Sequence, residues 1–407
     1  MAQNAIYAQS GGVTAVINAT AAGVIQTAQL HPNQIGKVFA AQNGILGVLN
    51  NQLFDCSNLS ASELEQLYFT PGGAFGSCRY KVKTDEEFEK LISVFKEHNI
   101  GYFFYNGGGD SQDTSWKVSE RAKNLGWPMQ CIGIPKTIDN DLPLTDNSPG
   151  YGSVAKYVAI STLEASLDVA SMARSSTKVF VLEVMGRHTG WIAAAAGLVG
   201  QNEMEAPHII LFPEITFDEK KFLAKVDETV KKCGFCVIVT SEGVRNEQGK
   251  FLSAQSRTDA FGHAQLGGVA SYLTSLVQEK LGYKHHYAIA DYLQRSARHI
   301  ASQVDVDQAF ALGKHAVEIA LAGKHGVMPI IVRKSSNPYQ WTIDDAPLTD
   351  VANIEKHMPK EFIRADGFGI TPACREYILP LIQGEAYPPY VNGLPNYLQK
   401  PIIDHGV

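Results

Sequence analysis

The sequence predicts an α/β fold with largely parallel sheets that are covered by helices on both faces. Short apolar runs recur along the chain, and each is followed by a glycine or turn cluster and then by a helical pattern. Strands that alternate with helices in this way form parallel sheets, because a parallel connection needs a crossover. The expected strands lie at residues 6–8, 102–105, 131–134, 179–182, 209–212, 237–240 and 328–332. Between two of them, Ile160, Leu163, Leu167 and Ala170 follow a helical period and predict an amphipathic helix.

The length indicates more than one domain. At 407 residues and 44.3 kDa, the chain exceeds the roughly 100–200 residues of an ordinary domain. We expect a first lobe at residues 1–150, to which the chain returns at about 284–335, and a second lobe at 151–283. Residues 336–407 are rich in Pro, Tyr and Asn near their end and are expected to form a C-terminal extension.

Composition and charge exclude several classes of protein. A net charge of -6 and a pI near 6.1 argue against a nucleic-acid binder, which needs a surplus of cations facing phosphate. Six cysteines are too few for a disulfide scaffold. We expect Cys233 to end a helix and Cys236 to begin a buried strand, rather than to form a redox or zinc pair. With no secretory signal and no apolar stretch long enough for a membrane span, the sequence predicts a cytoplasmic protein.

Glycine loops follow two of the expected strands. Ser10-Gly11-Gly12 precedes a helix expected to start near Thr14, where backbone N–H groups could approach an anion. Alone this is a weak signal, because many such turns are only turns. Gly107-Gly108-Gly109 runs directly into Asp110, which is harder to explain by turn geometry, although Asp110 as a helix N-cap is the alternative.

Two further loops carry charged groups at strand ends. Pro135-Lys136-Thr137-Ile138-Asp139-Asn140-Asp141 places two carboxylates, an ammonium and a hydroxyl together, and Met185-Gly186-Arg187-His188-Thr189-Gly190 places an arginine before a helix. Ligands of parallel sheets bind beyond the carboxyl ends of the strands. Phosphoryl transfer to a hydroxyl needs cations and N–H donors for the phosphoryl oxygens, a metal, and an acid to accept the proton. The four loops together suit that chemistry.

These residues resemble the phosphofructokinase family. PKTIDND and MGRHTG are similar to its two most characteristic motifs, and SGG near residue 11 and GGAFGSCR at 72–79 stand where the family has them. The resemblance covers residues 6–323, about four-fifths of the chain. It implies two Rossmann-like lobes, a phosphoryl-donor lobe at 1–150 with 284–335 and a sugar-phosphate lobe at 151–283.

Two positions separate phosphoryl donors within this family. ATP-dependent members usually have glycine where this chain has Asp110 and Lys136, and pyrophosphate-dependent members resemble this chain at both. An unpaired aspartate about 4 Å from the α-phosphate of ATP would repel it by roughly 4 kcal/mol at an effective dielectric near 20. Lys136 supplies a charge to the moving phosphoryl group and the departing phosphate. The resemblance therefore implies a pyrophosphate-dependent enzyme acting on fructose 6-phosphate.

The resemblance also implies roles for individual residues. Asp139 is expected as the general base toward the 1-hydroxyl, Thr137 with Ile138 as phosphoryl or sugar contacts, and Arg187 as the group that stabilises developing charge. Gly11 and Arg79 match contacts to the donor. The expected sugar-phosphate ligands are Met185, Gly186, Arg187, Glu242, Tyr292, Arg295, Lys178 and His286. A second segment, FGHAQLGG at 261–268, is only superficially similar to the 6-phosphate motif and is expected to start a helix.

Departures from the family pattern leave alternatives open. Lys178 and His286 stand where bacterial relatives carry arginines that reach the 6-phosphate of a neighbouring subunit, so another acceptor such as sedoheptulose 7-phosphate is conceivable. Gly109 replaces a magnesium-binding aspartate, so either Asp110 takes Mg²⁺ or pyrophosphate and water hold it. An ATP-dependent enzyme that tolerates Asp110 and a non-catalytic regulatory subunit are the competing functions. The resemblance further implies a homodimer or homotetramer, with no nucleic-acid or membrane partner.

Overall fold

The computed structural model describes residues 2–252 and 268–398, and the chain divides into two compact units. Unit 1 consists of Met1–Ser153, Ser296–Lys356 and Gly384–Val407, and unit 2 consists of Val154–Arg295 and His357–Gln383. The chain thus returns to unit 1 at Ser296, later than the expected 284. Residues 336–407, expected as one extension, are divided between the two units.

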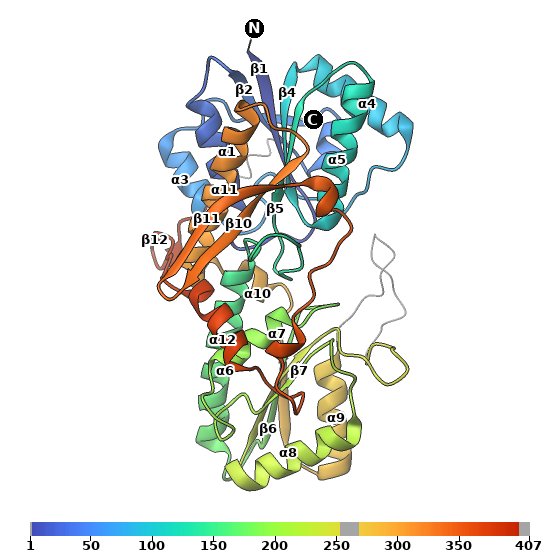
Figure 1. The fold of residues 1–407 in the computed structure, drawn as a ribbon. Helices are drawn as coiled ribbons and strands as arrows, with labels where there is room; N and C mark the ends of the chain where they lie inside the picture. Colours follow the sequence, from blue (N-terminus) through green and yellow to red (C-terminus); the bar gives the residue numbers. More distant parts are fainter. Residues whose placement is uncertain (1, 253–267, 399–407) are drawn as a thin grey trace. The chain divides into compact units, whose positions relative to one another are not determined.

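Unit 1 is built on a seven-stranded sheet in the order β11-β10-β5-β4-β1-β2-β3 (Figure 1). Its strands are β1 (Gln3–Gln9), β2 (Ile35–Ala41), β3 (Leu53–Asp55), β4 (Ile100–Gly107), β5 (Gln130–Pro135), β10 (Val327–Ser336) and β11 (Tyr339–Pro347). The inner strands pair in parallel, and β3 and β11 add antiparallel edges. The four apolar runs expected in this part of the chain lie in β1, β4, β5 and β10. The mixed edge strands were not predicted.

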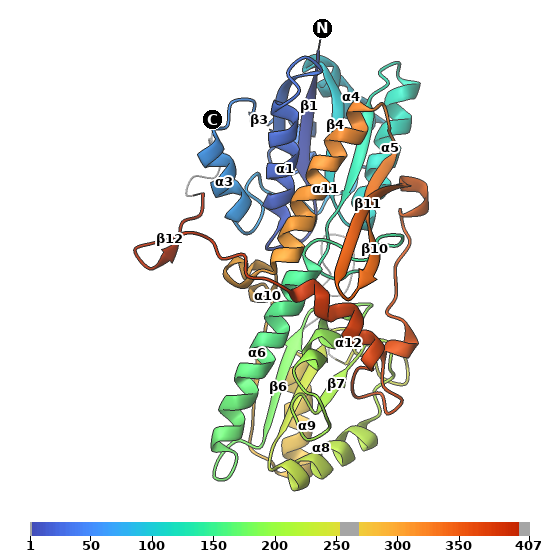
Figure 2. The ribbon, with the colours of Figure 1, turned by 60° about the vertical axis from the view of Figure 1, so that its left-hand side comes forward.

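Helices cover both faces of this sheet, as the alternating pattern predicted. The helices of unit 1 are α1 (Ile17–Gln29), α2 (Ile45–Leu49), α3 (Ala61–Phe69), α4 (Asp85–Glu97), α5 (Gly109–Asn124) and α11 (Gln303–Leu321). α1 and α11 lie side by side and share one apolar core with α3, while α2, α4 and α5 share the other (Figures 1 and 2). α4 shows why such helices begin where they do, because Thr84 and Glu87 form a reciprocal capping box at its first turn. Within the described residues, the last two strands are β12 (Tyr390–Val391) and β13 (Leu394–Pro395), which form a short hairpin.

Unit 2 contains a four-stranded, fully parallel sheet in the order β7-β8-β6-β9. Its strands are β6 (Val179–Val184), β7 (Ile209–Leu211), β8 (Cys236–Ser241) and β9 (His285–Ile289). The three expected runs lie in β6, β7 and β8, and β9 was not predicted. Its helices are α6 (Tyr151–Met172), which begins in unit 1, α7 (Trp191–Ala195), α8 (Glu219–Cys233), α9 (Val269–Leu281), α10 (Leu293–Ser296) and α12 (Pro372–Ile378). Helices α8 and α9 form an apolar core with the sheet.

The apolar stripe that predicted helix α6, which runs from Ile160 to Ala170, does not face a core. Leu163 and Leu167 are 45% and 65% exposed, while Val158 and Val169 on another side of the helix are buried. The helical period was therefore correct, and the assignment of its buried face was wrong.

The cysteine pair behaves as the sequence predicted. Cys233 ends α8, Cys236 begins β8, and both thiols are free. Burial raises the pKa of both thiols, which disfavours the thiolate that redox chemistry and zinc binding require. The segment 261–267, where we expected a helix start, lies outside the described residues. None of the helices in the described part of the chain is long and apolar enough to cross a membrane.

Candidate active site

Three loops of unit 1 meet at the carboxyl ends of the adjacent strands β1, β4 and β5. Ser10 N–H donates to Asn106 O at 2.9 Å, and Lys136 N–H donates to Gly107 O at 3.1 Å. Lys136 itself is buried, and its Nζ donates to Gly12 O at 2.6 Å. The sheet therefore brings the SGG loop, the triple-glycine loop and the PKTIDND loop to one edge, where the family resemblance expects the phosphoryl donor.

Gly11 leaves room for the Lys136 ammonium. Its φ of +74° is a left-handed conformation, and a Cβ at this position would lie 3.3 Å from Lys136 Nζ. The helix that follows begins only at Ile17, so the expectation of a helix start near Thr14 is wrong. The positive charge beside this loop comes from Lys136, and not from the end of a helix.

The residues that precede Arg79 are hydrogen-bonded to the SGG loop. Gly11 N–H donates to Cys78 O at 2.9 Å, and Ser77 Oγ donates to Gly11 O at 2.8 Å. These bonds place the segment that carries Arg79 against the SGG loop. The Arg79 side chain is exposed and so can be reached by a ligand from solvent.

Asp110 lies in the first turn of α5, where the N-cap is Gly108. The alternative that Asp110 serves as the N-cap is therefore wrong. Its carboxylate is half exposed and accepts a hydrogen bond from Lys81 Nζ at 3.0 Å, and the same ammonium lies 3.5 Å from Asp113 Oδ2. Lys81 was not among the predicted site residues. Its nearness to the donor loop was signalled only by the basic pattern RYKVK that follows the glycine segment.

The PKTIDND loop has a defined local geometry. Asp139 N–H donates to Thr137 Oγ1 at 3.0 Å, and the neighbouring Ile138 is buried. Burial raises the pKa of Asp141, and the nearby Glu355 carboxylate raises it further. Burial therefore makes the charged form of the Asp141 carboxylate less favourable than it is in water.

In unit 2, two predicted loops meet at the ends of neighbouring strands. Glu242 N–H donates to Val184 O at 2.9 Å, and Ser241 Oγ donates to Gly186 O. A Cβ at Gly243 would lie 2.2 Å from Arg187 O, so only glycine allows this approach. Burial raises the pKa of Glu242, and the Arg187 guanidinium opposes the rise. Met185, Gly186, Arg187 and Glu242 therefore form one cluster.

The segment with Tyr292 and Arg295 joins the same cluster. Met185 N–H donates to Gln294 Oε1 at 3.2 Å. The Arg295 guanidinium stacks over the Tyr292 ring, with its central carbon 4.0 Å from the ring centroid. Tyr292 is 63% exposed, so its hydroxyl can be reached from solvent. This geometry leaves a phenol and a guanidinium close together, a pair that can bind phosphate oxygens.

Lys178 and His286 lie at the other end of the same sheet. Lys178 immediately precedes β6, and His286 is the second residue of β9, whereas Arg187 follows the carboxyl end of β6. At 3.3 Å per residue, β6 separates Lys178 from Arg187 by roughly 20 Å. A single chain therefore does not bring these two residues to the Arg187 cluster.

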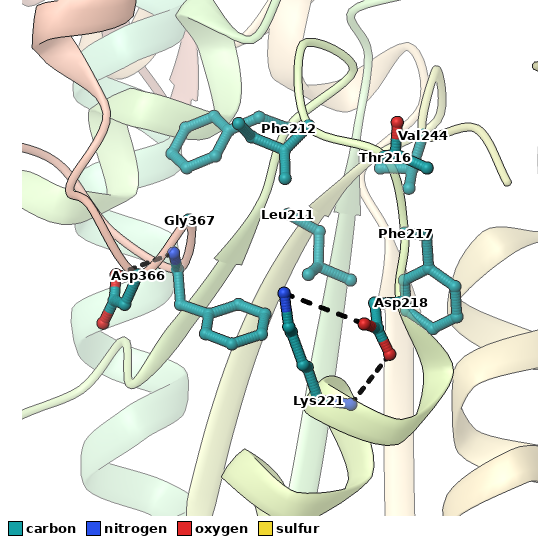
Figure 3. A pocket seen from close by; sticks show the side chains of 11 residues that line it. Leu211, Phe212, Thr216, Phe217, Asp218, Lys221, Val244, Asp366 and Gly367 are labelled. Atoms are coloured by element: carbon teal, nitrogen blue, oxygen red, sulfur yellow. Dashed lines mark hydrogen bonds and ion pairs between the residues drawn. The ribbon is translucent and has the colours of Figure 1, made fainter. Parts of the chain in front are cut away.

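None of these residues lines the pocket of unit 2 shown in Figure 3. Leu211, Phe212, Phe217 and Phe368 form much of its wall. Lys221, a cation at this pocket, lies 3.8 Å from the Asp218 carboxylate. Because the wall is mainly apolar and this cation already faces a carboxylate, the pocket does not suit a sugar phosphate or pyrophosphate.

The described side chains offer few ligands for a metal ion. Within residues 2–252 and 268–398, no group of three or more His, Cys, Asp and Glu side chains could hold a metal ion. The Asp110 carboxylate, which we considered as a ligand of Mg²⁺, forms an ion pair with the Lys81 ammonium. The described side chains therefore do not form a ready magnesium site.

Comparisons with known proteins agree with the motifs. The phosphofructokinase family model matches residues 4–320. A curated protein of Halomonas elongata, described as pyrophosphate–fructose 6-phosphate 1-phosphotransferase, is 62% identical over 97% of this chain and 96% of its own. A protein of Methylococcus capsulatus with the same description is 59% identical over 98% of this chain and 96% of its own. The crystal structure of a pyrophosphate-dependent phosphofructokinase from Marinobacter aquaeolei superposes with a TM-score of 0.90 at 59% identity, covering 97% of this chain and 95% of that one.

Proposed function

This chain belongs to the phosphofructokinase family, and we propose that it transfers a phosphoryl group from pyrophosphate to the 1-hydroxyl of fructose 6-phosphate. The products are fructose 1,6-bisphosphate and phosphate, and the reaction is reversible. One observation carries the choice of donor: the buried Lys136 ammonium and the Asp110 carboxylate lie on adjacent loops at one sheet edge. The ammonium suits a compact anion, and the carboxylate opposes the further phosphate of a nucleotide.

We assign the chemical step to residues of the predicted loops. Asp139 accepts the proton of the 1-hydroxyl as its oxygen attacks the terminal phosphorus, and the bond from that phosphorus to the bridging oxygen breaks. Lys136 and Arg187 stabilise the negative charge on the moving phosphoryl group and on the departing phosphate. Thr137 contacts the phosphoryl group or the sugar, and Gly11 and Arg79 bind the donor.

Unit 2 is assigned to the sugar phosphate. Glu242 binds a sugar hydroxyl, while Met185 and Gly186 shape the pocket for the ring. Tyr292 and Arg295 bind the 6-phosphate, which the stacking of guanidinium on phenol supports. In this proposal, unit 1 is the donor lobe and unit 2 is the sugar-phosphate lobe.

We propose that Mg²⁺ enters bound to pyrophosphate. The ion keeps several waters and is commonly held by substrate phosphates with few protein carboxylates. That coordination fits a donor loop whose aspartate is already paired with Lys81.

A donor assay tests the function directly. The purified full-length chain is assayed with fructose 6-phosphate and either pyrophosphate or ATP, and we expect kcat/KM to be higher with pyrophosphate by at least a hundredfold. A higher kcat/KM with ATP would overturn the proposal. If neither donor gives fructose 1,6-bisphosphate, the non-catalytic alternative is favoured.

We also propose that the active species is at least a homodimer. Lys178 and His286 lie far from the Arg187 cluster of their own chain, so a sugar-phosphate pocket that uses them must receive them from a second copy. On the same unit, Leu163, Leu167, Tyr287 and Ile289 are exposed apolar residues of α6 and β9. We expect sedimentation velocity at assay concentration to show a dimer or larger species that carries the activity. An active monomer would contradict this.

A further inference from the structure

One lysine from the C-terminal part of the chain reaches the catalytic loop of unit 1. Lys356 Nζ donates to Asp146 O at 2.8 Å, to Thr145 O at 3.1 Å and to Asn140 Oδ1 at 3.3 Å. The backbone N–H of Lys356 also donates to Asp141 O at 2.6 Å. A single residue therefore contacts both ends of the segment 140–146, which begins directly after Asp139.

The segment needs such support because its shape is unusual. Asn140 has a φ of +54°, a left-handed conformation in a residue other than glycine, and it is fully buried. Its Oδ1 accepts a hydrogen bond from Ser148 N–H at 3.1 Å as well as from Lys356. Local strain of this kind persists only where surrounding contacts hold it. The Lys356 ammonium is one of the groups that hold it.

We propose that Lys356 is a positioning residue that fixes the segment 140–146, and with it the general base Asp139 that directly precedes this segment. The inference rests on the proposed function, because it assigns Lys356 an effect on the step that Asp139 performs. It also gives residues 344–356 a role, since they bring Lys356 to a loop about 210 positions earlier in the chain.

The charge environment makes this contact sensitive to pH. Asp141 and Asp146 favour the charged ammonium, while Arg333 opposes it, and Glu355 lies close to Asp141. Burial outweighs the two carboxylates and lowers the pKa of Lys356 to about 8. The ammonium is therefore present below pH 8, and the neutral amine that replaces it above pH 8 donates weaker hydrogen bonds to the loop.

The pH dependence of kcat distinguishes positioning from simple loss of stability. Between pH 8 and the usual lysine pKa near 10.5, the unfolded chain binds more protons at this residue than the folded chain does. The contribution of Lys356 to the free energy of unfolding therefore increases with pH over this range. We expect kcat of the wild type to fall over the same range, which a stability effect of this residue cannot produce.

The test compares Lys356→Met and Lys356→Arg with Lys334→Met, a change at an exposed lysine on β10 of the same unit. We expect Lys356→Met to lower kcat about tenfold or more, with less than a threefold change in KM for fructose 6-phosphate, and to lack the fall in kcat above pH 8. Lys356→Arg keeps its charge at every assay pH, so it should regain activity and remain active above pH 8. Lys334→Met should match the wild type.

Three results would overturn the inference. One is a wild-type kcat that stays flat from pH 7 to 10, which also decides the question if Lys356→Met does not fold. Another is a folded Lys356→Met variant with kcat within twofold of the wild type. The third is an unchanged alkaline fall in kcat in a folded Lys356→Arg variant. A wild type without pyrophosphate-dependent activity would instead contradict the proposed function itself.

Discussion

Replacing both Asp110 and Lys136 by glycine is expected to reverse the donor preference of this chain. Asp110→Gly removes the carboxylate that repels a nucleotide phosphate, and Lys136→Gly removes the buried ammonium that is proposed to stabilise the charge on the moving phosphoryl group. We expect kcat/KM with pyrophosphate to fall by a factor on the order of a thousand, and the ratio of ATP to pyrophosphate use to rise by at least a hundredfold. Both are measured with the same coupled assay.

Asp110 should contribute less to the preference for pyrophosphate over ATP than a full unpaired charge would. An unpaired charge about 4 Å from a phosphate contributes roughly 4 kcal/mol at an effective dielectric near 20. Asp110 is half exposed to solvent and lies 3.0 Å from the Lys81 ammonium, and both facts reduce the repulsion. We therefore expect the Asp110 change alone to improve ATP use by about ten- to a hundredfold.

Matched variants separate charge from size. Asp110→Asn keeps the volume of the side chain and removes its charge, so it should reproduce most of the gain in ATP use that Asp110→Gly gives. Lys136→Arg keeps a cation and should retain more pyrophosphate activity than Lys136→Gly. If Asp110→Asn behaves like the wild type while Asp110→Gly admits ATP, the donor is selected by space and not by repulsion.

The sequence was sufficient to predict the α/β class and the convergence of the donor loops. The buried runs of β1, β4 and β5 are strongly apolar, and the loops after parallel neighbours must meet at one sheet edge. Strand β2 and the edge strand β9 were missed because their exposed or polar residues interrupt the apolar pattern. The buried face of α6 was misjudged for a related reason. A helical period identifies an apolar face of the helix, but it does not tell whether another element of the same chain packs against that face.

Lys81 and Lys356 could not be predicted as parts of the site. Lys356 comes from a segment without a recognisable motif, and Lys81 is signalled only by the basic pattern RYKVK. Each makes a contact with residues distant in the sequence. Lys81 bonds to a carboxylate 29 positions away, and Lys356 bonds to a side chain 216 positions away. Local spacing carries no information about such contacts. The division of residues 336–407 between two units was hidden for the same reason.

The change with the largest expected effect on chemistry alone is Asp139→Ser. A general base contributes about 10²- to 10⁴-fold to a rate, so kcat should fall by that factor while pyrophosphate binding, measured by calorimetry, changes little. The PKTIDND loop offers a second carboxylate, Asp141, whose backbone carbonyl accepts a hydrogen bond from the Lys356 N–H. We expect Asp139 rather than Asp141 to serve as the base, because the family motif implies that role for Asp139, and Asp141 is the residue to compare with it.

Matched variants distinguish Asp139 from Asp141 as the general base. Asp141→Asn preserves the size of the side chain and should reduce kcat far less than Asp139→Asn does. Asp344→Ser, at an exposed position on β11, is the control for an aspartate-to-serine change and should leave kcat unaltered. If Asp139→Ser keeps kcat within tenfold of the wild type, another group accepts the proton. A larger loss in Asp141→Asn than in Asp139→Asn would identify that group as Asp141, because only the residue that takes the proton is required in its ionised form.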